Sequence, residues 1–168
     1  MDGRPFSVLF LCTGNSARSI LAESLLNGRG GRGFVGYSAG SQPKGRVHPI
    51  ALDLLGAMKL PTAGVRSKSW DEFSGAGAPG LDAVITVCDA AAGETCPIWP
   101  GHPLTAHWGI ADPASVKGSA TQQRAAFRKA FDELDVRIAG LLSLPIGSLD
   151  RAGLQERLRA IGRADRGG

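Results

Sequence analysis

The chain has 168 residues, of which 43% are hydrophobic and 20% are charged, and its formal net charge is +4. This length and composition fit one folded domain with a full hydrophobic core and exclude a disordered chain. The positive charge suits an anionic ligand, but it is spread along the sequence, which argues against nucleic acid as a partner, and no apolar run reaches membrane-spanning length.

Apolar runs and helical periods alternate in the first third of the chain. Residues 6–11 form an apolar run that predicts a buried strand, and residues 17–28 carry apolar side chains at helical spacing. A glycine-rich stretch at 28–33 leads to a second strand over 34–39 and a helix over 48–60. The letters GRGGRG fit a dinucleotide-binding pattern, but they follow a helix and precede a strand, the reverse of the required context. We therefore interpret this stretch as a loop.

The alternation continues through the rest of the chain. We expect a short helix around 69–73, a strand over 81–88, a weaker strand over 104–110 and a long amphipathic helix over 121–144. Strands that alternate with helices predict an α/β fold with a doubly wound parallel sheet in a single domain. We place this domain at residues 1–145 and regard residues 146–168 as a C-terminal helical extension and tail.

The C-terminal extension contains an apolar stripe of Leu154, Leu158 and Ile161 at helical spacing. A short amphipathic helix needs a surface to cover this stripe. We expect it to pack on its own domain, and the alternative is a contact between two copies in a homodimer. The stripe lacks aromatic residues, which argues against a membrane-bound helix.

Three cysteines, Cys12, Cys88 and Cys96, are present in the chain. A small odd number in a chain of this length favours reactive thiols in a reducing compartment over a framework of structural disulfides. The N-terminus also lacks the apolar core of a secretion signal. We therefore expect a cytoplasmic protein.

The sequence LCTGNSARS, residues 11–19, joins the first strand to the first helix. Glycine and asparagine accept left-handed backbone conformations, so this turn can curl until its N–H groups converge on one anion. The helix adds the positive end of its dipole, and Arg18 adds a two-pronged donor for a tetrahedral oxyanion. The residues that we expect to bind the oxyanion are Thr13, Gly14, Asn15, Ser16, Ala17, Arg18 and Ser19.

Cys12 precedes this turn and would lie on the floor of the oxyanion site. The electropositive surroundings predict a thiol pKa below the ordinary value, and therefore a thiolate nucleophile at neutral pH. Ser19 is placed to donate a hydrogen bond to the sulfur. The alternative is a buried cysteine without a chemical role, with Arg18 only capping the helix. The strand-to-helix position favours the nucleophile.

The stretch VLFLCTGNSARSILAE resembles the phosphate-binding loop of the low-molecular-weight protein tyrosine phosphatase superfamily, which includes arsenate reductases of the same fold. The resemblance covers about residues 6–143 and includes YSAG at 37–40 and HWGIADP at 107–113. It implies a four-stranded parallel sheet flanked by helices. It also implies that Asp112 is the general acid that protonates a departing oxygen. An ordinary Asp-Pro turn is the alternative.

The two remaining cysteines separate the two chemistries of this superfamily, because a phosphatase needs neither of them. In the thiol-relay arsenate reductases that the sequence resembles, Cys12 attacks arsenate, Cys88 attacks Cys12 to release arsenite, and Cys96 takes over the disulfide. The resemblance thus implies Cys12, Arg18, Asp112, Cys88 and Cys96 as catalytic residues. It also implies no tightly bound cofactor and an external reductant, either thioredoxin or glutaredoxin with glutathione.

Three other functions fit parts of the sequence. A phosphotyrosine phosphatase is the main alternative, although DPAS at 112–115 lacks the tyrosines that often follow the acid in that branch. A protein that binds oxyanions or senses redox state without turnover is another. Zinc could bind Cys88, Cys96, His102 and His107, but their spacing matches none of the usual patterns, so we expect no metal.

Overall fold

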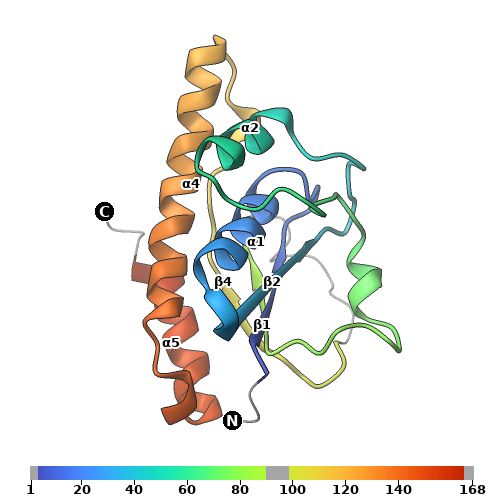
Figure 1. The fold of residues 1–168 in the computed structure, drawn as a ribbon, viewed down its shortest axis with the longest axis vertical. Helices are drawn as coiled ribbons and strands as arrows, with labels where there is room; N and C mark the ends of the chain where they lie inside the picture. The colour runs from blue at the N-terminus through green and yellow to red at the C-terminus, as the bar shows by residue number, and fades with distance from the viewer. Residues whose placement is uncertain (1–3, 90–98, 165–168) are drawn as a thin grey trace.

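The structure, a computed structural model, describes residues 4–89 and 99–164. In these ranges four parallel strands form one sheet in the order β2-β1-β3-β4, flanked by helices (Figure 1). The strands are β1 (Phe6–Leu11), β2 (Phe34–Ala39), β3 (Ala83–Thr86) and β4 (Leu104–His107). The α-helices are α1 (Arg18–Arg29), α2 (Pro49–Ala57), α4 (Ala120–Leu142) and α5 (Arg151–Ala164). The predicted α/β fold with a four-stranded parallel sheet is therefore confirmed.

Short 3-10 helices fill several of the connections. They are η1 (Gly31–Gly33), η2 (Trp70–Phe73), η3 (Pro113–Ser115) and η4 (Ile146–Ser148). We interpreted the GRGGRG stretch as a loop, but its first two residues belong to α1 and its last three form η1, so the link from α1 to β2 is largely helical. The second 3-10 helix, η2, corresponds to the short helix predicted around 69–73.

The helix predicted over 48–60 is shorter in the structure, where it spans Pro49–Ala57. Lys59, two residues past its end, has a left-handed φ of 59°. A residue in that conformation terminates an α-helix. At the other end, His48 caps the helix, because its Nδ1 accepts the backbone N–H of Ile50 at 3.1 Å.

The strands predicted over 81–88 and 104–110 are also shorter, and they are β3 and β4. Before β3, the carboxylate of Asp82 accepts the backbone N–H of Ser7 in β1 at 2.8 Å. Strand pairing would otherwise use this N–H. After β4, the chain keeps only single contacts with its neighbour, such as the bond from the N–H of Ile110 to the carbonyl of Val87 at 3.0 Å. Polar side chains and turns thus shorten both apolar runs.

The sheet is buried on both faces, as its continuous apolar runs predict. In β1, Val8 and Phe10 belong to the core cluster formed with the helices, while Leu9 and Leu11 belong to a second cluster on the other face. The second cluster also contains Phe73, Leu81, Val84 and Trp99. Because both faces of β1 are covered, the turn that follows this strand starts from a fixed position.

The strand order determines where a site can form. β2 lies on one side of β1 and β3 lies on the other. The direction in which successive strands are added to the sheet therefore reverses between β1 and β3. Ligands of open α/β sheets bind in the crevice at the carboxyl ends of strands at such a point. Leu11 pairs with Thr86, which in turn pairs with His107. The residues that follow β1 and β3, Cys12 and Cys88 among them, therefore lie at one edge of the sheet.

Helix α5 packs on its own chain, against the edge strand β4. Leu154 and Leu158 are buried, and the indole N–H of Trp108 donates to the carbonyl of Leu158 at 2.9 Å. The side chain of Gln155 bonds both backbone polar groups of Thr105, accepting the N–H at 3.2 Å and donating to the carbonyl. These contacts cover an edge that would otherwise offer hydrogen bonds to another chain. No helix in the described ranges is both long and apolar enough to cross a bilayer.

Replacing Leu158 by alanine should lower the free energy of unfolding by about 2–5 kcal/mol, since the truncation leaves a cavity in a filled core. The control is Val136→Ala on α4, where the side chain is 63% exposed and the change should stay within about 0.5 kcal/mol. Urea titration followed by circular dichroism measures both values. A Leu158→Ala effect no larger than the control would contradict the packing of α5 on the domain.

Candidate active site

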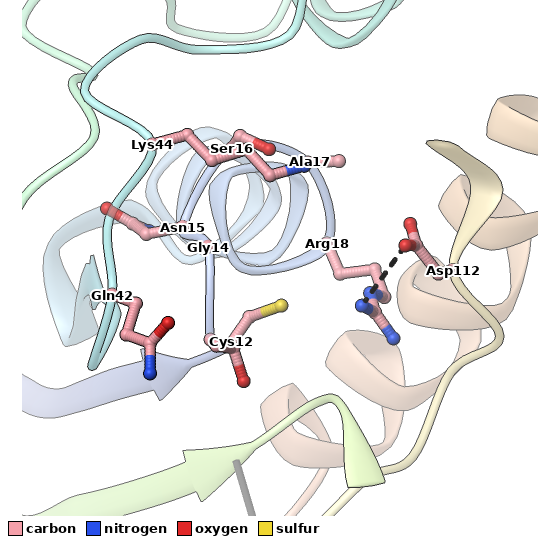
Figure 2. A pocket seen from close by; sticks show the side chains of 10 residues that line it. Cys12, Gly14, Asn15, Ser16, Ala17, Arg18, Gln42, Lys44 and Asp112 are labelled. Carbon is pink, nitrogen blue, oxygen red and sulfur yellow. Dashed lines mark ion pairs between the residues drawn. The ribbon is translucent and has the colours of Figure 1, made fainter. Parts of the chain in front are cut away.

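An open cavity of about 380 Å³ lies at the carboxyl end of β1, at the first turn of α1. It is lined by all residues from Cys12 to Arg18 and by Gln42, Lys44 and Asp112. Figure 2 shows the Cys12 sulfur and the Arg18 guanidinium directed into the same space, with the Asp112 carboxylate on the far side of Arg18. The structure thus brings together the nucleophile, the arginine and the acid predicted from the sequence.

Three carbonyl groups of the loop after Cys12 are turned toward a neighbouring segment. The backbone N–H groups of Gln42, Lys44 and His48 donate to the carbonyls of Thr13, Gly14 and Ser16 at 3.0, 2.9 and 2.9 Å. Because a peptide unit is planar and trans, its N–H points opposite to its C=O. The N–H groups that follow these carbonyls, on Gly14, Asn15 and Ala17, therefore point away from that segment, and all three residues line the cavity. Converging N–H groups of this kind bind anions.

Asn15 holds the curled conformation of the loop. Its φ is 44°, so the predicted left-handed conformation occurs here, whereas Gly14 does not adopt it. The buried side chain donates from Nδ2 to Ser19 Oγ at 2.8 Å and accepts the N–H of Lys68 at Oδ1, at 2.9 Å. In the structure the Ser19 hydroxyl oxygen accepts a bond from Asn15, which does not use the hydroxyl proton, so the donation from Ser19 to the Cys12 sulfur stays a prediction. The contact between Asn15 and Ser19 supports the loop.

Gln42 and Lys44 line the cavity and were missing from the predicted site. The chain of Lys44 lies against Gly14, where an added Cβ would be 3.1 Å from Lys44 Cε. This contact brings a further positive charge to the mouth of the cavity. No sequence motif marks either residue, because their place follows from backbone bonds between segments far apart in the fold.

Arg18 connects the loop to the segment that carries Asp112. Its Nη1 donates to the carbonyl of Ile110 at 2.9 Å, and its Nη2 lies 3.7 Å from Asp112 Oδ2. The other carboxylate oxygen, Oδ1, accepts the N–H of Ala114 at 2.9 Å at the start of η3. One oxygen of Asp112 is therefore fixed by the backbone, while the other faces Arg18 and the cavity (Figure 2).

Cys12 and Cys88 are neighbouring, buried free thiols at the ends of β1 and β3. They are 5% and 2% exposed, and their side chains are within hydrogen-bond contact. The Cys88 sulfur also accepts the backbone N–H of Thr13 at 3.4 Å, with Thr13 Oγ1 3.8 Å away. Two of the three predicted thiols are thus in contact with each other. The third, Cys96, lies outside the described residues.

Residues 7–156 match the family model of low molecular weight phosphotyrosine protein phosphatases. The chain belongs to this family. An arsenate reductase of Bacillus licheniformis is 35% identical over 132 residues, which make up 79% of this chain and 91% of that protein.

Solved structures extend the likeness to the fold. The arsenate reductase of Archaeoglobus fulgidus shares 28% identity at a TM-score of 0.63, over 82% of this chain and 99% of that one. A thioredoxin-dependent arsenate reductase of Corynebacterium glutamicum shares 24% identity and the fold, at a TM-score of 0.59. That match covers 84% of this chain and spans 62% of the other.

In this family member, the pKa of the Cys12 thiol is raised. The hydrogen bond with Cys88 is the main cause and burial is the second, while Arg18 and the N–H of Gly14 act in the opposite direction. Our prediction of a lowered pKa considered the cation and the N–H groups but not a second sulfur in contact. It is therefore wrong for the site without an oxyanion.

A buried ion pair supports the loop from behind. Lys68 Nζ lies 3.7 Å from Glu23 Oε1, and the hydroxyl of Ser38 donates to the same oxygen at 2.5 Å. Burial raises the pKa of the Glu23 carboxyl and lowers the pKa of the Lys68 ammonium. Since the backbone of Lys68 also holds Asn15, the pair fixes its segment against the curled loop.

The residues considered as zinc ligands do not form a site in the described ranges. No group of three or more histidine, cysteine or acidic side chains is arranged there to hold a metal ion. The Cys88 sulfur is engaged by Thr13, and both ring nitrogens of His107 bond other side chains, Thr86 and Asp89.

Gly40, the last residue of YSAG, lies directly against the loop, where an added Cβ would be 2.4 Å from the Thr13 carbonyl oxygen. We expect Gly40→Ala to displace that carbonyl and so to weaken phosphate binding, because small misplacements of binding groups are costly. The phosphate concentration that protects Cys12 from an alkylating reagent should then rise about tenfold or more. The control is Gly56→Ala, where no atom lies within 4 Å of the added Cβ. Equal protection in both variants would contradict this role of Gly40.

Removing the Cys88 sulfur should lower the pKa of Cys12, because it removes the largest cause that raises it. The rate of Cys12 alkylation against pH, read from the labelled peptide by mass spectrometry, has its midpoint at this pKa. In Cys88→Ala we expect the midpoint to fall by about one pH unit or more, the effect of losing one hydrogen bond. Cys96→Ser is the control: it also removes a thiol, and we expect it to leave the midpoint for Cys12 unchanged. A midpoint unchanged by Cys88→Ala would show that Cys88 has no influence on Cys12.

Proposed function

We propose that this protein reduces arsenate to arsenite, with Cys12 as the nucleophile and with Cys88 and Cys96 as the thiols of a disulfide relay. The observation that carries the proposal is the contact between the buried sulfurs of Cys12 and Cys88. Hydrolysis of a phosphate ester uses one thiol and water, whereas a two-electron reduction requires a second thiol within reach of the first. The identity to arsenate reductases supports the same conclusion.

The cavity favours a small inorganic oxyanion. The N–H groups of the loop and the Arg18 guanidinium supply donors on one side, and Lys44 adds charge at the mouth. Among the described residues that line the cavity, none has an aromatic side chain that could stack on a phenyl ring. Tetrahedral arsenate needs the donors but no aromatic wall.

In the first step the Cys12 sulfur attacks arsenic and a sulfur–arsenic bond forms. An arsenate oxygen departs as water after it receives a proton from Asp112, whose Oδ2 faces Arg18 and the cavity. Arg18 and the loop N–H groups stabilise the negative charge on the remaining oxygens. Because burial and Cys88 disfavour a standing thiolate, the thiol proton of Cys12 passes to the departing arsenate oxygen during this attack, and together with the proton from Asp112 it completes the water that leaves.

In the second step Cys88 attacks the Cys12 sulfur. A Cys12–Cys88 disulfide forms, the sulfur–arsenic bond breaks, and its electron pair remains on arsenic, which leaves as arsenite. Arsenic is reduced by two electrons and the two thiols are oxidised. The N–H of Thr13 on the Cys88 sulfur stabilises its thiolate, the form that attacks.

The relay then passes to Cys96, which attacks Cys88 and frees the Cys12 thiol. A straight helix from 88 to 96 would separate the two Cα atoms by about 12 Å, whereas a disulfide tolerates about 4.4–6.8 Å, so this step could not occur within one straight helix. An external dithiol, from thioredoxin or from glutaredoxin with glutathione, reduces the Cys88–Cys96 disulfide and completes the cycle.

Hydrolysis of aryl phosphates is the second candidate, because the family model describes phosphotyrosine phosphatases. Cys12, Arg18 and Asp112 are sufficient for that reaction, in which water cleaves the covalent adduct. The two activities therefore share their first step and differ in the need for Cys88.

Arsenate reduction with thioredoxin, glutaredoxin with glutathione, or glutathione alone, assayed beside hydrolysis of p-nitrophenyl phosphate, separates the candidates. Cys12→Ser should abolish both activities. Cys88→Ser should remove multiple-turnover arsenate reduction but spare any phosphate hydrolysis, because only the reductive step needs a second sulfur. Cys96→Ser should release one arsenite per protein and then stop as a Cys12–Cys88 disulfide.

The relay is wrong if Cys88→Ser and Cys96→Ser both reduce arsenate over many turnovers at the wild-type rate. Phosphate hydrolysis without arsenate reduction would identify a phosphatase. A wild-type protein that binds phosphate but performs neither reaction would support oxyanion binding without catalysis.

A further inference from the structure

A chain of two hydrogen bonds runs through His107 at the end of β4. Thr86 Oγ1 bonds His107 Nδ1 at 2.7 Å, and His107 Nε2 bonds Asp89 Oδ1 at 2.7 Å. A neutral imidazole satisfies both contacts when Nδ1 accepts from the threonine hydroxyl and Nε2 donates to the carboxylate. His107 is therefore held at both ring nitrogens.

Two members of this series of hydrogen bonds, Thr86 and His107, lie in a rigid part of the fold. Thr86 and His107 are register partners in adjacent strands, so their backbones are fixed by the sheet. Helix α5 also packs tightly against this point, because a Cβ on Gly162 would be 2.2 Å from the His107 carbonyl oxygen. By contrast, the carboxylate of Asp89 is 88% exposed, and His107 is the partner that holds it in the described structure.

Asp89 directly follows Cys88, so the bond to His107 fixes the backbone on one side of that cysteine. On its sulfur side, Cys88 is engaged by Thr13 of the oxyanion loop. The two contacts together define the direction from which the Cys88 sulfur approaches Cys12. Thiol–disulfide exchange depends on the position of the attacking sulfur, so a looser Cys88 reacts more slowly.

We propose that His107 is a positioning residue for Cys88: through Asp89 it orients the second thiol for attack on Cys12. This inference rests on the proposed relay and adds a residue to it that contacts neither the oxyanion nor a reacting sulfur. His107 thereby gives the HWG sequence a role in the second step, whereas Asp112 of the same stretch acts in the first.

The test uses the full chain with Cys96→Ser, in which the reaction stops at the Cys12–Cys88 disulfide. After arsenate is added, quenched samples are analysed by mass spectrometry for this disulfide, and released arsenite is measured in parallel. We expect His107→Ala and Asp89→Ala each to slow disulfide formation about three- to tenfold, the effect of losing one hydrogen bond. The double variant should be no slower than either single one, because both remove the same contact.

Three controls separate positioning from a general structural effect. Asp89→Asn keeps an acceptor for His107 Nε2 and should retain most of the rate. Asp53→Ala removes another exposed carboxylate, which pairs with Arg124 at 3.2 Å, and should leave the rate unchanged. In every variant, phosphate should protect Cys12 from alkylation as in the parent, since the oxyanion loop is untouched.

Disulfide formation in His107→Ala at the rate of the parent would overturn the inference. So would a slowed rate that is accompanied by loss of phosphate protection, because the oxyanion loop would then be disturbed. If the parent itself forms no Cys12–Cys88 disulfide and releases no arsenite, the proposed function fails, and with it the step that His107 would assist.

Discussion

The orientation of three peptide groups in the loop after Cys12 is the constraint on which the site depends. Their carbonyls accept the N–H groups of Gln42, Lys44 and His48, and this turns the following N–H groups away from that segment. Asn15 supplies the left-handed residue that the curl needs, and the buried Glu23–Lys68 pair holds the segment that fixes it. The shape of the candidate anion site therefore depends on segments outside the loop, some of which also line the cavity.

Much of the fold and the center of the site could be predicted because their signals are local. The apolar period of each helix and the apolar runs of the strands lie within short windows of sequence. Cys12 and Arg18 are close in sequence, at a strand-to-helix junction whose geometry is fixed once both elements are recognised. The α/β alternation also predicts that strands share one carboxyl edge, and Cys12 meets Cys88 there.

The sequence could not predict features that depend on which distant segments come into contact. The place of Lys44 follows from backbone bonds of its segment to the loop, and no motif encodes that pairing. The bond that Ser19 Oγ accepts from Asn15, four residues earlier, was also not predicted. The direction of the Cys12 pKa was wrong because it depends on the contact with Cys88, 76 positions away in the sequence numbering.

That second sulfur has a chemical consequence that bears on the two candidate reactions. A hydrolytic nucleophile works best with a lowered pKa, and Arg18 and the Gly14 N–H act in that direction. The Cys88 sulfur opposes both, so for hydrolysis alone its position is unfavourable. For a relay the same position is necessary, because a sulfur that is to attack Cys12 must already lie against it. The raised pKa of Cys12 is thus the expected cost of keeping the second thiol in contact, and it is this contact that supports the proposed reductase.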